Sequence, residues 1–187
     1  SSDPLSVAAD AAGAVTFNAS IPLSVSALRA LTNERGETLN SAIPVYDLDK
    51  KPAGPVVVPE FADGDGWTSS VVVVNPSDRQ MAGEIRFISP GNGTTPGSPI
   101  GVSIGDGAAS AVAYDVPPNS AQRIQTSGAG VRSSFPLSGK NGFNLRSTGV
   151  QADQVTGYAQ VSVPAGLPPV NGLQILEHRE GGVTTSE

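Results

Sequence analysis

Residues 56–75 decide the fold, and they read VVVPEFADGDGWTSSVVVVN. Two β-branched runs flank an Asp-Gly-Asp-Gly turn, and Val, Thr and Trp suit a pleated, half-buried surface. The run Val71–Val74 is continuously apolar, as in a central strand that is covered on both faces. Pro76 follows at once and ends the strand, because proline cannot donate to a ladder. The stretch predicts the central hairpin of a β-sandwich.

Composition supports the same fold class and excludes several functions. The 187 residues include 22 Gly and 16 Pro but only 15% charged residues, which favours many short strands joined by turns over helices. A net charge of −6 with scattered Lys and Arg argues against nucleic-acid binding. No apolar run approaches the roughly 20 residues that span a bilayer. The chain has no Cys, so neither a disulfide framework nor a thiolate metal site is possible.

The chain divides into four predicted regions. Residues 1–13 form an arm without a core, residues 14–46 are rich in strands, residues 47–54 form a charged and Pro-rich linker, and residues 55–187 form a complete β-sandwich module. Strands are predicted at residues 15–21, 38–45, 82–88, 100–104, 110–116, 121–125, 143–146, 155–163, 173–176 and 183–185, with a surface excursion at 126–141.

An internal repeat is the most informative feature of the sequence. Residues 25–41 align without a gap with residues 170–186, and Val, Leu, Leu, Gly and Ser coincide. The repeat favours a strand over a short helix at residues 25–31, and it makes the N-terminal part the tail of a module. A tail without its front half leaves strand edges exposed, so it must pack on the complete module or on a neighbouring subunit. The residues predicted to carry that assembly are Val15, Phe17, Ile21, Leu28 and Leu31.

Several stretches also carry a family resemblance. Residues 61–68 with 71–76, and then 85–87, 114–118, 125–128 and 182–187, resemble a module that is repeated in large secreted bacterial proteins, notably of acidobacteria. Residues 27–35 resemble the tail of the preceding repeat in that family. The resemblance implies an immunoglobulin-like extracellular module and offers no catalytic residues.

For each candidate chemical site, the sequence supports a structural role of the residues better than a functional one. Ser103 lies in a Gly-x-Ser-x-Gly pattern, but a nucleophile elbow needs a strand-to-helix turn and a His, and no helical pattern follows. His178 is the only His, and a turn or surface role is favoured for it. Asp63 and Asp65 are a weak Ca²⁺ candidate, since Asp-Gly pairs are also common in tight turns and the later ligands of a calcium loop are missing.

The sequence therefore predicts an all-β protein, an immunoglobulin-like sandwich with an additional N-terminal strand-rich segment. Its predicted core residues are Trp67, Val71, Val73, Phe87 and Tyr114. We expect a non-enzymatic structural protein, secreted or on the cell surface, that needs no cofactor and self-assembles into a filament by strand addition or contacts neighbouring modules. The alternative is a carbohydrate-binding or adhesion module with a glycan surface, which would need exposed aromatic side chains on one sheet face.

Overall fold

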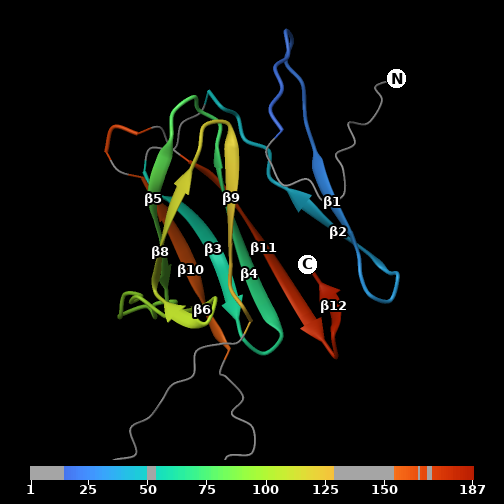
Figure 1. Cartoon of the computed structure of the whole chain (residues 1–187), viewed down its shortest axis with the longest axis vertical. Helices are drawn as coiled ribbons and strands as arrows, with labels where there is room; N and C mark the ends of the chain where they lie inside the picture. Colours follow the sequence, from blue (N-terminus) through green and yellow to red (C-terminus); the bar gives the residue numbers. More distant parts are fainter. Residues whose placement is uncertain (1–14, 50–53, 129–153, 164, 168–169) are drawn as a thin grey trace, which may run out of the picture.

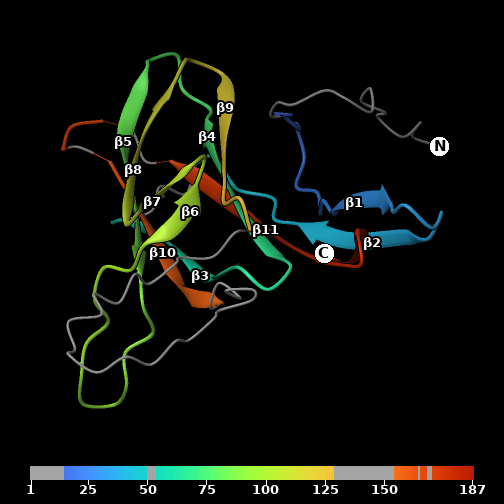
Figure 2. The ribbon, with the colours of Figure 1, turned by 60° about the horizontal axis from the view of Figure 1, so that its bottom comes forward.

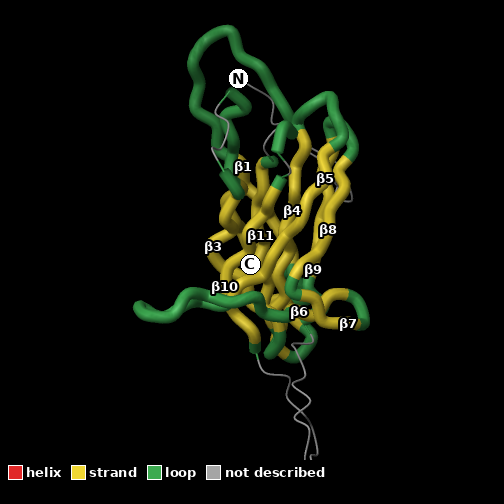
Figure 3. Tube along the Cα trace, turned by 90° about the vertical axis from the view of Figure 1, so that its left-hand side faces the viewer, coloured by secondary structure: helices red, strands yellow, loops and turns green. Residues whose placement is uncertain are grey.

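The computed structural model describes residues 15–49, 54–128, 154–163, 165–167 and 170–187. Every regular element in these residues is a β-strand, and no helix occurs among them (Figure 3). The all-β prediction is therefore confirmed.

Two four-stranded antiparallel sheets face each other, as in a β-sandwich (Figure 1). The first sheet has the order β3 (Val56–Asp63), β10 (Val155–Ser162), β5 (Met81–Ile88), β8 (Ala111–Val116). The second has the order β12 (Val183–Ser186), β11 (Asn171–Glu180), β4 (Trp67–Asn75), β9 (Ser120–Gln125). Two hairpins complete the described part, β1 (Ala27–Thr32) with β2 (Thr38–Ile43), and β6 (Val102–Ile104) with β7 (Gly107–Ala109).

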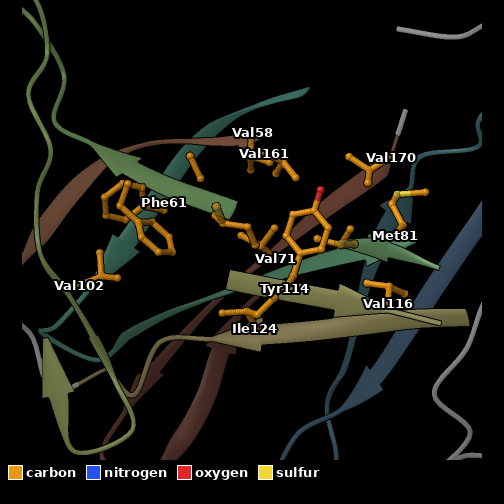
Figure 4. Packing of buried hydrophobic residues seen from close by; sticks show 14 residues of the cluster. Val58, Phe61, Val71, Met81, Val102, Tyr114, Val116, Ile124, Val161 and Val170 are labelled. Carbon is orange, nitrogen blue, oxygen red and sulfur yellow. The ribbon is translucent and has the colours of Figure 1, made fainter. Parts of the chain in front are cut away.

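The core lies between the two sheets, and half of its members are Val (Figure 4). Phe61 and Phe87 pack edge to face with their ring centroids 5.2 Å apart. Full burial of a Val or Phe side chain contributes roughly 1.5–3 kcal/mol, so this cluster supplies most of the driving force for folding. Its members are Val58, Phe61, Val71, Val73, Met81, Ile85, Phe87, Val102, Tyr114, Val116, Ile124, Ala159, Val161 and Val170.

One predicted core residue lies elsewhere. Trp67 is only half-buried, at the start of β4, and its ring packs on that of His178 with the centroids 4.7 Å apart. The corner before β4 places this side chain at the end of the sheet instead of between the sheets. The other four residues expected in the core, Val71, Val73, Phe87 and Tyr114, are buried in it.

The corner between β3 and β4 corrects the predicted central hairpin. The two strands lie in facing sheets, and they meet at an isolated bridge between Gly64 and Trp67. Residues 64–66 all have positive φ, at 99°, 51° and 82°, which turns the chain sharply. Across the corner the Ser69 hydroxyl donates to the Ala62 carbonyl and accepts from the Ala62 N–H, both at 2.8 Å. A side chain thus replaces the ladder that a hairpin would have formed.

The strand order also differs from that of an immunoglobulin constant domain. There the first strand pairs with the second, and the last strand pairs with the one before it. Here the first strand of the sandwich, β3, lies beside β10, and β11, which follows β10 in the chain, lies beside β4. If β3 and β11 are taken as the first and last strands of that domain, they have exchanged sheets relative to it, while the additional strand β12 pairs with β11.

The N-terminal segment differs from its prediction in one element. Residues 27–32 form a strand, as the repeat favours, but residues 15–21 form no ladder. Alternating apolar residues make a strand only where a neighbour offers hydrogen bonds, and this segment has no such neighbour in the described part. The predicted arm at 1–13, the strand at 143–146, most of the excursion at 126–141 and linker residues 50–53 lie outside the described residues.

Candidate functional site

The N-terminal hairpin lies beside β11 and β12 and belongs to neither sheet of the described sandwich (Figures 1 and 2). Its turn is built around Asn33, whose side-chain oxygen accepts from the N–H groups of Arg35 at 3.0 Å and Glu37 at 2.9 Å. Gly36 adopts a φ of 80°, which closes the loop. Asn33 is buried, so the tip of the hairpin has a fixed shape.

That tip contacts the C-terminal hairpin through polar groups. The Asn33 amide donates to the Thr184 carbonyl at 2.9 Å, and the Thr184 N–H donates to the Glu34 carboxylate at 2.8 Å. Arg179 forms an ion pair with the same carboxylate. The bond from the Thr184 N–H, with a smaller contribution from Arg179, lowers the pKa of Glu34 below its ordinary value.

A second group of contacts lies further along the hairpin. The Arg29 guanidinium is 3.4 Å from the Glu177 carboxylate and also pairs with Glu187, whose side chain is almost fully buried. The Ser41 hydroxyl donates to Glu187 at 3.3 Å. We call the two groups together the clasp. Its members are Arg29, Asn33, Glu34 and Ser41 of the N-terminal hairpin, and Glu177, Arg179, Thr184 and Glu187 of the C-terminal hairpin.

The base of the N-terminal hairpin adds one further contact. The Tyr46 hydroxyl donates to the Gly172 carbonyl on β11, and burial raises the pKa of this phenol. Each of these contacts involves at least one side chain, and no backbone ladder links the hairpin to the sandwich within the described ranges. The Glu34–Arg179 pair is exposed and contributes little, whereas the Arg29–Glu187 pair is largely buried. A few side-chain contacts therefore hold the hairpin, where backbone ladders hold the strands of the core.

The two hairpins that meet in the clasp are the two copies of the repeat, but their turns differ. Residues 33–37 form a five-residue loop, whereas residues 181–182 form a two-residue turn. Gly36 matches the first turn glycine, but Glu37 stands where Gly182 has a φ of 83°. A two-residue hairpin turn of this kind needs positive φ at both positions, which Glu adopts only with strain.

Large apolar side chains are exposed along the N-terminal segment. Leu28 is 75% exposed and Ile21 is 72% exposed, while Leu31 is half-buried. Such residues are normally scattered singly over a surface, and their concentration in one segment is typical of an interaction site. The exposed large apolar residues of the described part are Val15, Phe17, Ile21, Leu23, Val25, Leu28, Val45, Tyr46 and Leu48 in this segment, and Val57 outside it.

The Ca²⁺ candidate has a structural role instead. The buried Asp63 carboxylate accepts from the Ser103 N–H at 2.6 Å, the Ser103 hydroxyl at 2.7 Å and the Gly128 N–H at 3.0 Å. Its oxygens are thus engaged inside the protein, and Asp65 lies in the exposed turn. No group of three His, Asp or Glu residues in the described part of the chain has the geometry to hold a metal ion. The arrangement fastens the β6–β7 hairpin to the end of β3.

The Ser103 pattern has none of the context of a nucleophile elbow. Ser103 is buried in β6, and the chain continues through a turn into β7 instead of into a helix. Its hydroxyl donates to Asp63 and accepts from the Ser127 hydroxyl at 2.8 Å. His178 lies in β11, with its ring against Trp67. These contacts account for both side chains without catalysis.

The outer face of the first sheet carries a shallow groove of about 370 Å³. Tyr158 and Gln160 of β10 line it together with Arg86 and Glu84 of β5, which form an exposed ion pair. An aromatic ring beside planar polar groups is the kind of surface that a sugar contacts. The groove is therefore relevant to the alternative prediction of a carbohydrate-binding module.

No family model, curated protein or solved structure matches this chain. Among the described residues, no helix is long and apolar enough to cross a membrane. Sequence patterns do not reveal the clasp residues, although residues 33–36 have the composition of a turn. The repeat indicates that the two hairpins are related, but nothing in the sequence indicates that they touch.

Proposed function

We propose that this protein is a non-enzymatic structural subunit of an extracellular filament, in which residues 15–49 join one copy to the next by strand addition. The observation that carries the proposal is the concentration of exposed large apolar side chains in that segment. Burying such side chains between copies would supply the free energy of association. The resemblance to modules of large secreted bacterial proteins, and the low fraction of charged residues, support an extracellular setting.

Strand addition is supported by two features of the described part. Residues 15–21 alternate Val15, Phe17 and Ile21 with smaller or polar residues, yet they form no ladder with any other described segment. The edge strands of the two sheets, as far as the structure describes them, are β3 and β8 in the first and β12 and β9 in the second, and each of them pairs with a neighbour on one side only. An unpaired segment and an unpaired sheet edge are the two partners that strand addition requires.

Size-exclusion chromatography with light scattering over a concentration series tests the proposal. We expect the mass of the unmodified chain to rise with concentration, and the Phe17→Glu variant to stay monomeric. The Ser20→Glu variant is the matched control, because it adds the same charge to the same segment without removing an apolar side chain. A monomeric mass for the unmodified chain at every concentration would contradict the proposal.

The groove beside Tyr158 favours a second candidate, a carbohydrate-binding or adhesion module. Tyr158 would stack on a sugar ring while Arg86, Glu84 and Gln160 bond to its hydroxyl groups. A glycan array would show binding by the unmodified chain and its loss in the Tyr158→Ala variant. The Phe17→Glu variant, which leaves the groove intact, should retain the binding.

A further inference from the structure

We infer that the clasp is exchanged between copies, so that the N-terminal hairpin of one copy binds the C-terminal hairpin of the next. The inference rests on the proposed function and names its partner, a second copy of this chain. It concerns the contacts of Asn33 and Glu34 with Thr184 and Arg179, together with those of Arg29.

The clasp suits exchange because, apart from the hydrogen bond from Tyr46 to Gly172, it provides the contacts described above between the N-terminal hairpin and the sandwich. The β1–β2 hairpin shares no ladder with the described strands of the sandwich, and its own loop is closed by Asn33 without help from outside. The hairpin can therefore leave as a formed unit and make the same hydrogen bonds on another copy. Swapping an identical element between protomers is a low-cost route to association, since every hydrogen bond that opens within a chain forms again between chains.

The connection between the hairpin and the sandwich is long enough for this. Residues 44–55 join β2 to β3, and three of these twelve residues are proline. Fully extended, they reach about 40 Å.

The charges of the two surfaces are complementary. The N-terminal hairpin presents Arg29 and Glu34, and the C-terminal hairpin meets them with Glu177 and Arg179 respectively. If the hairpin docked with the pairs exchanged, Arg29 would face Arg179 and Glu34 would face Glu177, and like charges would meet. The two ion pairs therefore specify one register of docking. The surfaces differ and lie at opposite ends of the chain, so the contact is head-to-tail. Contacts of this kind give open fibres when the rotation between copies does not close a ring.

The exchange also assigns a role to the exposed apolar residues. Because the clasp itself is the same within and between chains, it cannot favour assembly on its own. In the exchanged assembly residues 15–21, which precede the hairpin and are exposed within a single copy, lie at the junction between two copies, and burial of Val15, Phe17 and Ile21 at that junction tips the balance. Assembly then depends on concentration by mass action, whereas the closed monomer does not.

Engineered cysteines test the exchange cleanly, because the chain has no Cys of its own. The side chains of Glu34 and Thr184 approach within 3.4 Å, so one variant carries Glu34→Cys and another carries Thr184→Cys. The two single variants are mixed at a concentration where the unmodified chain associates and treated with a short bismaleimide, whose two thiol-reactive ends span the side-chain length lost on substitution by Cys. The products are then separated under denaturing conditions. Thr184→Cys mixed with Asn92→Cys, which lies in an exposed loop, gives the background.

We expect covalent dimers in the first mixture above that background, and a ladder of covalent polymers from the variant that carries both cysteines. Dimers no more abundant than the background, or a double variant that links only within one chain, would overturn the exchange. A second pair of variants, Arg29→Cys and Glu187→Cys, repeats the test in case a variant of the first pair does not fold. The absence of cross-linked dimers from both pairs would also overturn the exchange. Light scattering on the unmodified chain tests the proposed function separately. If the chain associates but the cross-links form only within single chains, the exchange alone is rejected. If the chain is a monomer at every concentration, the filament is rejected.

Discussion

The side-chain amide of Asn33 donates to the backbone carbonyl of Thr184 at 2.9 Å, while the side-chain oxygen of Asn33 holds the turn of its own hairpin. One residue therefore shapes the N-terminal hairpin and fastens it to the C-terminal hairpin, 151 positions further along the chain.

Substitution of Asn33 separates these two roles. Asn33→Asp keeps the oxygen that accepts from the loop N–H groups but removes the donor to Thr184, so the hairpin should form and dock weakly. Asn33→Ala removes both, at a cost of about 1–3 kcal/mol. Hydrogen exchange at residues 27–43 measures the difference: we expect partial loss of protection for Asn33→Asp and a larger loss for Asn33→Ala. Equal protection in both variants and the unmodified chain would contradict the role of Asn33.

Docking of the hairpin should weaken in acid. The pKa of Glu34 is lowered in the folded protein, chiefly by the bond from the Thr184 N–H, so its contribution is present above the ordinary glutamate pKa of about 4.3 and is lost as the pH falls through the lowered value. The amide proton shift of Thr184, followed by NMR, should report this titration. The titration should vanish in Glu34→Gln, and its persistence there would assign it to another group.

Asp63 should be among the most sensitive positions of the sandwich. Asp63→Ala removes the acceptor for Ser103 and Gly128 and leaves their N–H groups without a partner, which costs about 2–4 kcal/mol. Urea denaturation measures the free energy of unfolding. Asp106→Ala is the control, because it removes a carboxylate from the exposed turn between β6 and β7 and should leave stability nearly unchanged. A Ca²⁺-dependent stability of the unmodified chain would contradict the internal role of Asp63.

Gly83 should tolerate no side chain. A Cβ at this position in β5 would lie 2.1 Å from the Ser162 carbonyl oxygen and 2.4 Å from the Tyr114 hydroxyl, which itself donates to that carbonyl at 2.8 Å. We expect Gly83→Ala to lower the free energy of unfolding by about 1–3 kcal/mol, because β5 and β10 must separate. Gly93→Ala, where a Cβ meets nothing within 4 Å, should leave stability nearly unchanged. Equal stabilities of the two variants would contradict this packing.

The strands could be predicted where side-chain pattern and burial agree. Val71–Val74 is apolar throughout, and in β4 Val71 and Val73 are buried in the core while Val72 and Val74 are half-buried on the other face. The repeat identifies β1 because its leucines match those of β11. These signals are local, and a single sequence carries them.

The pairing of strands and the candidate site depend on contacts between distant residues. The Asp-Gly-Asp-Gly turn is recognisable in the sequence, but its three successive positive φ values send β4 into the opposite sheet, which a turn composition alone does not encode. Trp67 follows that corner and ends beside His178. In the clasp, Asn33 and Thr184 are common polar residues with no pattern around them, so only the fold brings them together.

Negative-stain electron microscopy of the purified chain, beside a chain that lacks residues 1–22, tests the filament most directly. We expect fibres from the full chain and separate particles from the shortened one, because Val15, Phe17 and Ile21 are removed. Separate particles from both chains, at concentrations well above those used for light scattering, would contradict self-assembly as a property of this protein.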